Sequence, residues 1–165
     1  RQAQFEALAI TNTGMSVGID IGAEREHPPN KHDVGIRLAR WALHRDYGFT
    51  DLVPSGPLYK RFKIEGDSVR IFFDYARNGL MLARKEGSEP PVPTPVARMP
   101  WLAFQAKDGT WHWADGRIDG SELIVSCKDV KEPVAVRYAY RQYLAGCNLY
   151  NKDGLPAAPF STCGY

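Results

Sequence analysis

After residue 50 the chain alternates short strand-like runs with turns that contain glycine. In the run Val69-Arg-Ile-Phe-Phe-Asp74, positions 69, 71 and 73 are apolar, while Arg70 and Asp74 fall on the opposite face. Many short strands at this spacing are typical of a β-sandwich. The predicted strands cover residues 58–64, 68–75, 80–84, 101–106, 110–114, 122–126 and 133–140. The predicted turns include Asn78-Gly79, Asp108-Gly109, Asp115-Gly116 and Asp119-Gly120.

Two stretches depart from this alternation. The proline-rich residues 88–96 predict a polyproline-like connection and not a strand. Residues 147–160 mix proline, glycine and apolar side chains, which predicts a tail with little regular structure that packs along a surface.

The first 48 residues follow a helix–strand–helix pattern. Residues 15–21 alternate apolar and polar side chains, as a strand does, and the second helix is expected from Lys31 to Tyr47, with Asn30 as its N-cap and Gly48 as its terminator. A lone strand with unpaired edges is not stable, so this segment needs sheet partners that it does not contain. Four apolar residues of the second helix are expected to face a core, namely Val34, Leu38, Trp41 and Ala42.

The loop between the predicted strand and this helix carries the candidate catalytic residues. Such a loop, leaving the carboxyl end of an α/β strand, is where these folds place their chemistry. The role predicted for His27 is a general base that takes a proton from a serine, with Glu24 orienting the imidazole. Glu26 is the second choice of orienting acid. Asp20, within the predicted strand, could instead have a structural role as a capping or bridging residue. The simpler alternative is a loop histidine bound to Glu24 for structure alone.

No nucleophile is visible beside this histidine. No serine lies in a Gly-x-Ser-x-Gly context, since Ser16 falls within a predicted strand and Ser55 within a Pro/Gly corner. A metal site is not favoured either, because the spacings of His27, His32 and His44 fit no zinc motif. A thiol-dependent enzyme is a weak alternative, because no cysteine lies near His27 in the sequence.

Tryptophans at positions 111 and 113 flank His112. They predict either an aromatic platform that stacks on a sugar or, more simply, a hairpin with alternating core and surface aromatics. Trp111 and Trp113, with Trp101, are therefore the first residues to test for carbohydrate contact.

Composition excludes several classes of protein. With 44% hydrophobic and 24% charged residues, the 165-residue chain is expected to be globular and soluble. A net charge of +2 with no Lys/Arg run does not indicate nucleic-acid binding, and no apolar run approaches the length of a membrane span.

The three cysteines lack metal-type spacing; they are expected to be buried thiols, or a Cys147–Cys163 disulfide in an oxidising compartment. Because it begins without an initiator methionine, the chain is expected to be a mature or processed product, or a fragment.

The motifs together resemble a known family. The run Asn12-Thr-Gly-Met-Ser-Val-Gly-Ile-Asp-Ile-Gly22, then His27-Pro28 and Asn30-Lys-His-Asp-Val-Gly-Ile-Arg-Leu-Ala39, resembles the last strand, histidine loop and last helix of the sialate O-acetylesterases, which are SGNH-type carbohydrate esterases. The resemblance covers nearly the whole chain. It continues through Ser55-Gly-Pro-Leu-Tyr59, the Asp119-Gly120 hairpin, Pro133-Val-Ala-Val-Arg-Tyr-Ala139 and residues 147–160.

The resemblance implies an α/β plus β fold. Residues 1–50 would be the C-terminal piece of a flavodoxin-like SGNH hydrolase domain, and residues 51–165 a β-sandwich accessory domain with an extended tail. The implied activity is hydrolysis of acetyl esters on sialic acid or on plant-polysaccharide sugars such as xylose, without cofactor or metal. The implied location is secreted or periplasmic.

The resemblance also assigns site residues. His27 matches the family's catalytic histidine, whereas the nucleophilic serine and the oxyanion-hole residues lie on an upstream segment. The family more often has Asp-Ile-His-Pro where this chain has Arg25-Glu26-His27-Pro28, a departure that bears on the orienting acid. The alternative from another class is a non-catalytic carbohydrate-binding β-sandwich module that uses the tryptophans.

Overall fold

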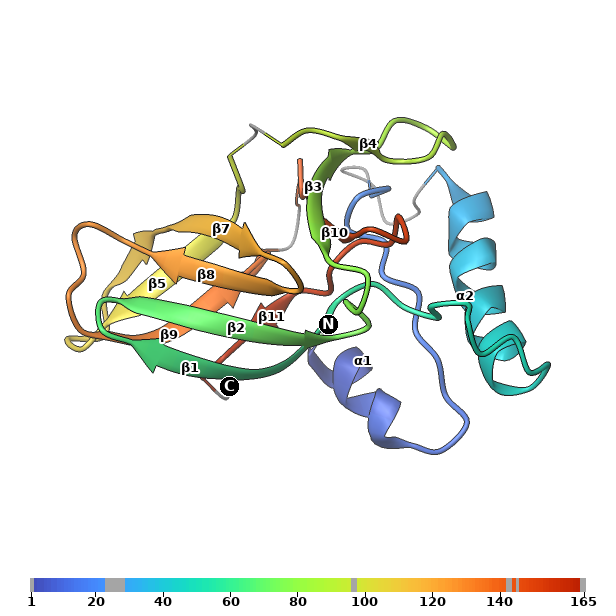
Figure 1. Cartoon of the computed structure of the whole chain (residues 1–165), viewed down its shortest axis with the longest axis horizontal. Helices are drawn as coiled ribbons and strands as arrows, with labels where there is room; N and C mark the ends of the chain where they lie inside the picture. Colours follow the sequence, from blue (N-terminus) through green and yellow to red (C-terminus); the bar gives the residue numbers. More distant parts are fainter. Residues whose placement is uncertain (1, 23–28, 96–97, 142–143, 145, 164–165) are drawn as a thin grey trace.

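The structure, a computed structural model, describes residues 2–22, 29–95, 98–141, 144 and 146–163. Two short helical elements, α1 (Gln2–Glu6) and η1 (Ala7–Ala9), precede the long helix α2 (Lys31–Arg45). Figure 1 shows α2 at one end of the molecule and most strands at the other. The strands are β1 (Leu58–Glu65), β2 (Ser68–Asp74), β3 (Leu80–Arg84), β4 (Val92–Pro93), β5 (Leu102–Ala106), β6 (Trp111–Trp113), β7 (Asp115–Asp119), β8 (Glu122–Ser126), β9 (Pro133–Tyr138), β10 (Leu149–Asn151) and β11 (Phe160–Ser161).

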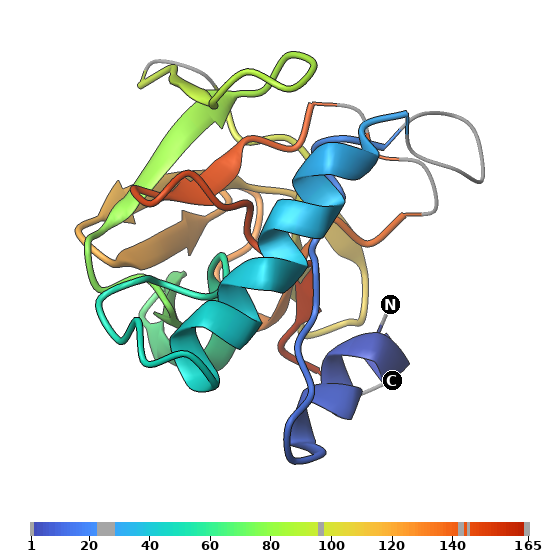
Figure 2. The same ribbon diagram turned by 90° about the vertical axis from the view of Figure 1, so that its right-hand side faces the viewer.

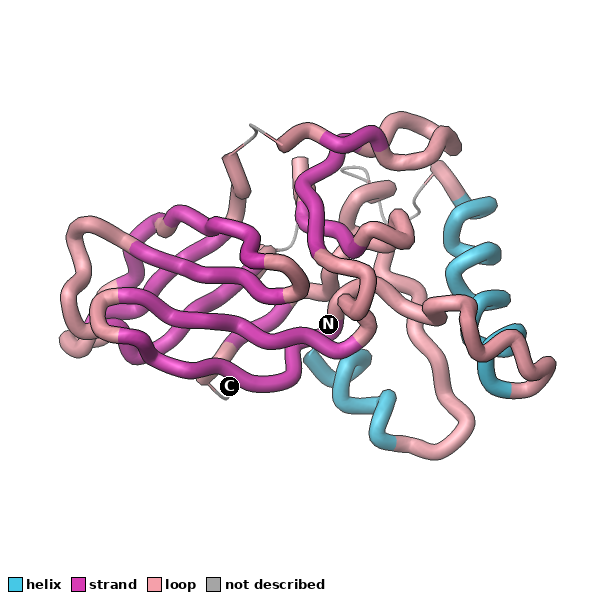
Figure 3. Tube along the Cα trace, viewed as in Figure 1, coloured by secondary structure: helices cyan, strands magenta, loops and turns pink. Residues whose placement is uncertain are grey.

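The β part of the fold has two four-stranded antiparallel sheets, in the strand orders β1-β2-β8-β7 and β11-β9-β5-β6, and a small sheet β10-β3-β4 (most strands labelled in Figure 1, magenta in Figure 3). Val69 and Ile71 of one sheet and Phe104 of the other are fully buried in the same apolar cluster. Burial of each such side chain stabilises the fold by about 1.5–3 kcal/mol. Arg70, between them on β2, points to the other face and contacts Glu122 at 2.7 Å. This is the sandwich arrangement that the period-2 pattern predicts.

Strand β7 lies where the sequence predicts turns at both ends. The turn at Asp119-Gly120 is confirmed, with Gly120 at φ +63° between β7 and β8. The prediction of a turn at Asp115-Gly116 is wrong, because Gly116 pairs with Val125 inside the sheet. A Cβ on Gly116 would lie 3.0 Å from Leu102 and 3.1 Å from Leu123, so this glycine makes room for the core.

The proline-rich connection is also partly regular. Val92–Pro93 form β4, which pairs with β3, so the prediction of no strand within residues 88–96 is wrong for these two residues. Proline is tolerated there because β4 lies at the edge of the small sheet β10-β3-β4.

The C-terminal tail runs through the interior and not along a surface. It supplies β10 and β11, and Tyr150 and Asn151 are both 0% exposed. The Asn151 amide donates to the carbonyls of Ser55 (3.0 Å) and Tyr75 (2.8 Å) and accepts from the Leu155 N–H (2.9 Å). These hydrogen bonds satisfy buried backbone groups that have no sheet partner, which the sequence pattern does not reveal.

Helix α2 begins and ends near the predicted positions. The Asn30 side chain accepts from the Asp33 N–H at 3.0 Å, which confirms the N-cap, and Gly48 adopts φ +77° after the helix. The predicted buried face is partly wrong. The buried residues of α2 are Arg37 and Trp41, whereas Leu38 is 47% exposed.

Residues 13–22 form neither helix nor strand, so the strand predicted over residues 15–21 is not found in the described chain. Its carbonyls accept hydrogen bonds from side chains of α2, beside which it runs in Figure 2. The Trp41 indole donates to the Met15 carbonyl at 2.9 Å, and Arg37 Nη1 donates to that of Val17. Val17 also packs against Leu58 and Ala158. The described part of residues 13–50 is therefore α2 and an extended segment without a sheet, and the flavodoxin-like unit stays a prediction.

Cys127, Cys147 and Cys163 are all thiols, and the Cys147–Cys163 disulfide is not formed. None of the described helices is both long and apolar enough to cross a membrane.

Candidate active site

The predicted catalytic loop lies between two described anchors. His27, Glu24 and Glu26 fall in residues 23–28, outside the described residues, so their roles stay predictions. The chain on either side is described, from Asp20 to Gly22 and again from Pro29. How these two ends are held determines where the loop can lie.

The start of the loop is anchored by a buried ion pair. Asp20 Oδ1 and Oδ2 accept hydrogen bonds from the two terminal nitrogens of Arg37, each at 2.7 Å. The Tyr150 hydroxyl, from β10, donates to Asp20 Oδ2 at 3.0 Å. The side chains of Asp20 and Arg37 are only 1% and 7% exposed. Asp20 is therefore a bridging residue between α2 and the β part of the fold.

Two charges can be buried here because both Asp20 oxygens and both terminal nitrogens of Arg37 have hydrogen-bond partners. A buried ion pair is tolerated only where its geometry is good and its remaining groups are hydrogen-bonded. Burial raises the pKa of Tyr150 well above its ordinary value, and the negative charge of Asp20 raises it further. Tyr150 is thus protonated at neutral pH and donates its hydrogen bond to Asp20.

The end of the loop is anchored to the connection that follows β3. Asn30 Nδ2 donates to Asp33 Oδ2 at 2.7 Å and to the Gly87 carbonyl at 2.8 Å. Lys85 Nζ lies 2.5 Å from the same Asp33 oxygen and also donates to the Gly87 carbonyl at 2.9 Å. The first turn of α2 is thus clamped to residues 85–87.

This clamp keeps the Asp33 carboxylate charged. Burial alone would raise the pKa of Asp33, but hydrogen bonds from Lys85 and Asn30 outweigh it and the net pKa is lowered. The Lys85 and Asp33 side chains are 5% and 13% exposed, so solvent screens the pair little. Both ends of the candidate loop are consequently fixed by the β part of the fold.

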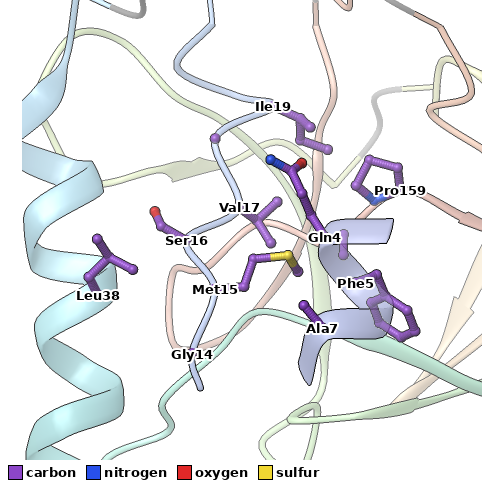
Figure 4. A pocket seen from close by; sticks show the side chains of 12 residues that line it. Gln4, Phe5, Ala7, Gly14, Met15, Ser16, Val17, Ile19, Leu38 and Pro159 are labelled. Atoms are coloured by element: carbon purple, nitrogen blue, oxygen red, sulfur yellow. The ribbon is translucent and has the colours of Figure 1, made fainter. Parts of the chain in front are cut away.

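An open cavity of about 570 Å³ lies along residues 14–19, between α1, α2 and the tail. Figure 4 shows Ser16 on the side of Leu38 and Met15 and Val17 on the other side, the alternation of an extended strand. The Ser16 hydroxyl is buried with no hydrogen-bond partner in the described chain. Leu38 and Ile36 of α2 are exposed apolar side chains that no other described residue covers, and they extend the apolar surface beside this cavity.

The described residues do not themselves make a catalytic pair. No hydrogen bond there joins a serine to a histidine. His44 Nδ1 lies 2.8 Å from the Leu52 carbonyl, and His112 Nε2 lies 3.0 Å from Thr110 Oγ1. Nor does the described chain hold a group of three or more His, Cys, Asp or Glu side chains that could bind a metal ion.

The tryptophans lie on the outer face of the second sheet. Trp111 and Trp113 share one face of β6, and Trp101 contacts Trp113 edge-to-face with ring centroids 6.1 Å apart. Trp113 is 62% exposed. A role in carbohydrate binding stays a prediction.

Sequence reasoning missed Arg37, Tyr150 and Lys85 as residues that position the loop. A weak signal exists for one of them, because Asp33, Arg37 and Trp41 recur at i, i+4 on α2 and so share a face. Tyr150 lies 130 residues from Asp20, and Lys85 is likewise distant from Asp33, so neither pairing is visible in the sequence.

Comparison with solved structures found clear likenesses, one of them to a carbohydrate acetylesterase. The crystal structure of a carbohydrate acetylesterase from Xanthomonas citri matches with a TM-score of 0.85 and 36% sequence identity, over 99% of this chain and 35% of that one. The present chain thus spans about a third of the length of that enzyme. No profile of a protein family matches the chain, and no curated protein sequence does. Over nearly its whole length, this chain is similar to part of a carbohydrate acetylesterase.

Proposed function

We propose that the chain is part of a carbohydrate esterase that removes acetyl groups from sugars. The observation that carries this proposal is the likeness to the Xanthomonas acetylesterase, at 36% identity over 99% of the chain. The chain matches only 35% of that enzyme, and in this proposal the activity also requires an upstream segment. That segment carries the nucleophilic serine and the donors of the oxyanion hole.

The proposed mechanism is acyl transfer through a serine. His27 takes the proton of the serine hydroxyl as it attacks the acetyl carbonyl, and then protonates the departing sugar oxygen. His27 next activates a water that releases acetate from the acyl-serine. Glu24 orients the imidazole on its other nitrogen. No cofactor or metal is assigned a role.

The contacts of Asp20 and Asn30 are consistent with the proposed role of His27, because they hold the chain on both sides of its loop. Asp20 and Asn30 fix the chain before and after the loop, and a catalytic group placed off its geometry loses much of its effect. Asp20 is engaged by Arg37 and Tyr150, which leaves Glu24 and Glu26 as the nearby acids. Glu24→Gln should therefore lose more activity than Glu26→Gln, and the reverse order would move the orienting role to Glu26.

The uncovered surface beside residues 14–19 supports a missing sheet neighbour. Met15, Val17 and Leu38 line a cavity of about 570 Å³. Leu38 and its neighbour Ile36 are exposed, and exposed apolar side chains of this kind mark sites of packing. We propose that residues 1–50 complete an SGNH hydrolase domain with the upstream segment, and that residues 51–165 form the accessory β-sandwich. The substrate would be acetylated sialic acid or a plant-polysaccharide sugar, met in a secreted or periplasmic location.

Acetate release tests the proposal. The protein that includes the upstream segment should hydrolyse an acetylated polysaccharide or p-nitrophenyl acetate, and the present chain alone should not. Equal activity of the chain alone would place the nucleophile within it. Absence of esterase activity in the longer protein would reject the proposal.

The second candidate is a carbohydrate-binding module without catalysis. It is favoured by the exposed Trp113 and its edge-to-face partner Trp101. Glycan binding by a longer protein that has no esterase activity would favour it over the acetylesterase.

A further inference from the structure

A second pocket lies on the outer face of the sheet β11-β9-β5-β6. Its floor is Ala103, which pairs with Trp113 of β6 on one side and Arg137 of β9 on the other. A methyl group between two long side chains leaves a depression of about 140 Å³ in the sheet surface. We call this the aromatic–arginine pocket; its other lining residues are Trp101, Trp111, Tyr140 and Arg141.

Arg137 is held rigidly within this pocket. Its guanidinium carbon lies 3.9 Å from the centroid of the Trp111 ring and 4.3 Å from that of Tyr140, so the cation is sandwiched between two aromatic faces. Arg141 approaches the Trp101 ring at 5.4 Å. Two guanidinium groups thus enter one small depression at fixed positions.

The described lining of the pocket is positively charged. Its described lining contains two arginines and no carboxylate. The Arg137 Nε is buried and has no hydrogen-bond partner in the parts of the chain that the structure describes. Buried donors are almost always satisfied, so an unpaired one at the wall of a pocket points to an acceptor that comes from a ligand.

Backbone strain is concentrated at the same place. Trp101 adopts φ +62° and Ala139 adopts φ +55°, and the Ala139 N–H donates to the Trp101 carbonyl at 2.9 Å. A bulky residue in the left-handed region persists only where the surroundings hold it there, and such strain gathers at binding sites. The effect here is to present the Trp101 ring beside Trp113.

We propose that the aromatic–arginine pocket binds a uronic acid residue of an acidic polysaccharide. The sugar ring stacks on the exposed Trp113, and its carboxylate accepts hydrogen bonds from Nε and one terminal nitrogen of Arg137 and lies beside Arg141. A planar carboxylate matches the fork of a guanidinium, and a pyranose face matches an aromatic ring. The site goes beyond the proposed esterase function, because binding there requires neither His27 nor the missing serine.

Intrinsic fluorescence of the whole chain tests the site. Three of the four tryptophans line the pocket, and the fourth, Trp41, is a buried residue of α2. Ligand binding in the pocket should therefore change the tryptophan emission. The probes are methyl glucuronide and methyl glucoside, which differ only in the carboxylate. The glucuronide should bind at least about tenfold more tightly, as a charge-assisted hydrogen bond predicts. Equal affinities, or no change of emission with either probe, would overturn the proposal.

Three variants locate the binding. Trp113→Ala and Arg137→Gln should each weaken glucuronide binding by about tenfold or more. Arg61→Gln is the matched control, because Arg61 stacks on Phe72 at 3.5 Å in the other sheet and carries the same charge. Unchanged binding in Trp113→Ala, or an equal loss in Arg61→Gln, would contradict the site. If Arg137→Gln does not fold, Trp113→Ala still decides the question, since the exposed Trp113 is not needed for the core.

Discussion

Replacement of Arg37 by methionine is the sharpest test of how the loop is held. The Asp20 carboxylate is 1% exposed and takes two hydrogen bonds of 2.7 Å from Arg37. Methionine would leave this charge buried with the Tyr150 hydroxyl, 3.0 Å away, as its remaining described donor. It would also remove the donor to the Val17 carbonyl. Removal of one partner from a buried ion pair costs about 3–5 kcal/mol, so we expect a loss of that size in the free energy of unfolding.

The assay is urea unfolding at neutral pH, followed by tryptophan fluorescence and extrapolated to water. The double variant Asp20→Leu/Arg37→Met should be more stable than Arg37→Met, because it leaves no charge buried. Arg84→Met is the control: Arg84 pairs with Glu86 at 2.9 Å, but both side chains are at least 70% exposed, so its loss should stay below about 1 kcal/mol. A loss in Arg37→Met no larger than in this control would refute the idea that the pair anchors the loop.

Two further predictions concern the contacts that hold the tail and α2. Gly56→Ala should destabilise the fold by about 3 kcal/mol or more, or prevent folding, because its Cβ would lie 1.9 Å from the Pro156 carbonyl oxygen. Gly35→Ala is the control, because a Cβ there meets nothing within 4 Å and its φ is not positive. An effect at position 56 no larger than at position 35 would contradict the close approach. The lowered pKa of Asp33 means that its stabilising effect is complete above the unfolded-state pKa and is lost as pH falls through the folded-state value. Asp33→Asn should therefore be less stable at neutral pH and lose less further stability than the wild type between about pH 5 and pH 2; parallel curves would argue against the clamp.

Local pattern accounts for most of the sandwich. Within the sandwich, where apolar residues alternate over five or more positions, as at Val69 and Ile71, the predicted strands are found. Strand β7 was not predicted because the dipeptide Asp115-Gly116 is a common turn signal. In this fold Gly116 lies within the strand and makes room for core side chains. The burial of the tail was not predicted because it depends on the amide of Asn151, whose partners lie up to 96 residues away.

The candidate site shows the same limit. The N-cap at Asn30 is a local feature and is predicted correctly. The Asp20–Arg37–Tyr150 cluster joins three distant segments, and period-2 alternation alone predicts a strand at Asp20 where the structure has an ion pair. Leu38 looks like a core residue by spacing, yet it is exposed because the described chain has no element to cover it.

The central claim is that His27 is the base of an acetylesterase. The most direct measurement is the rate of acetate release by the protein that includes the upstream segment, compared between His27→Ala and His32→Ala. His32 is the matched control, an exposed histidine five residues along at the start of α2. We predict that His27→Ala lowers the rate by about a thousandfold or more with an unchanged melting temperature, while His32→Ala stays near the wild-type rate. A near-normal rate in His27→Ala would contradict the account.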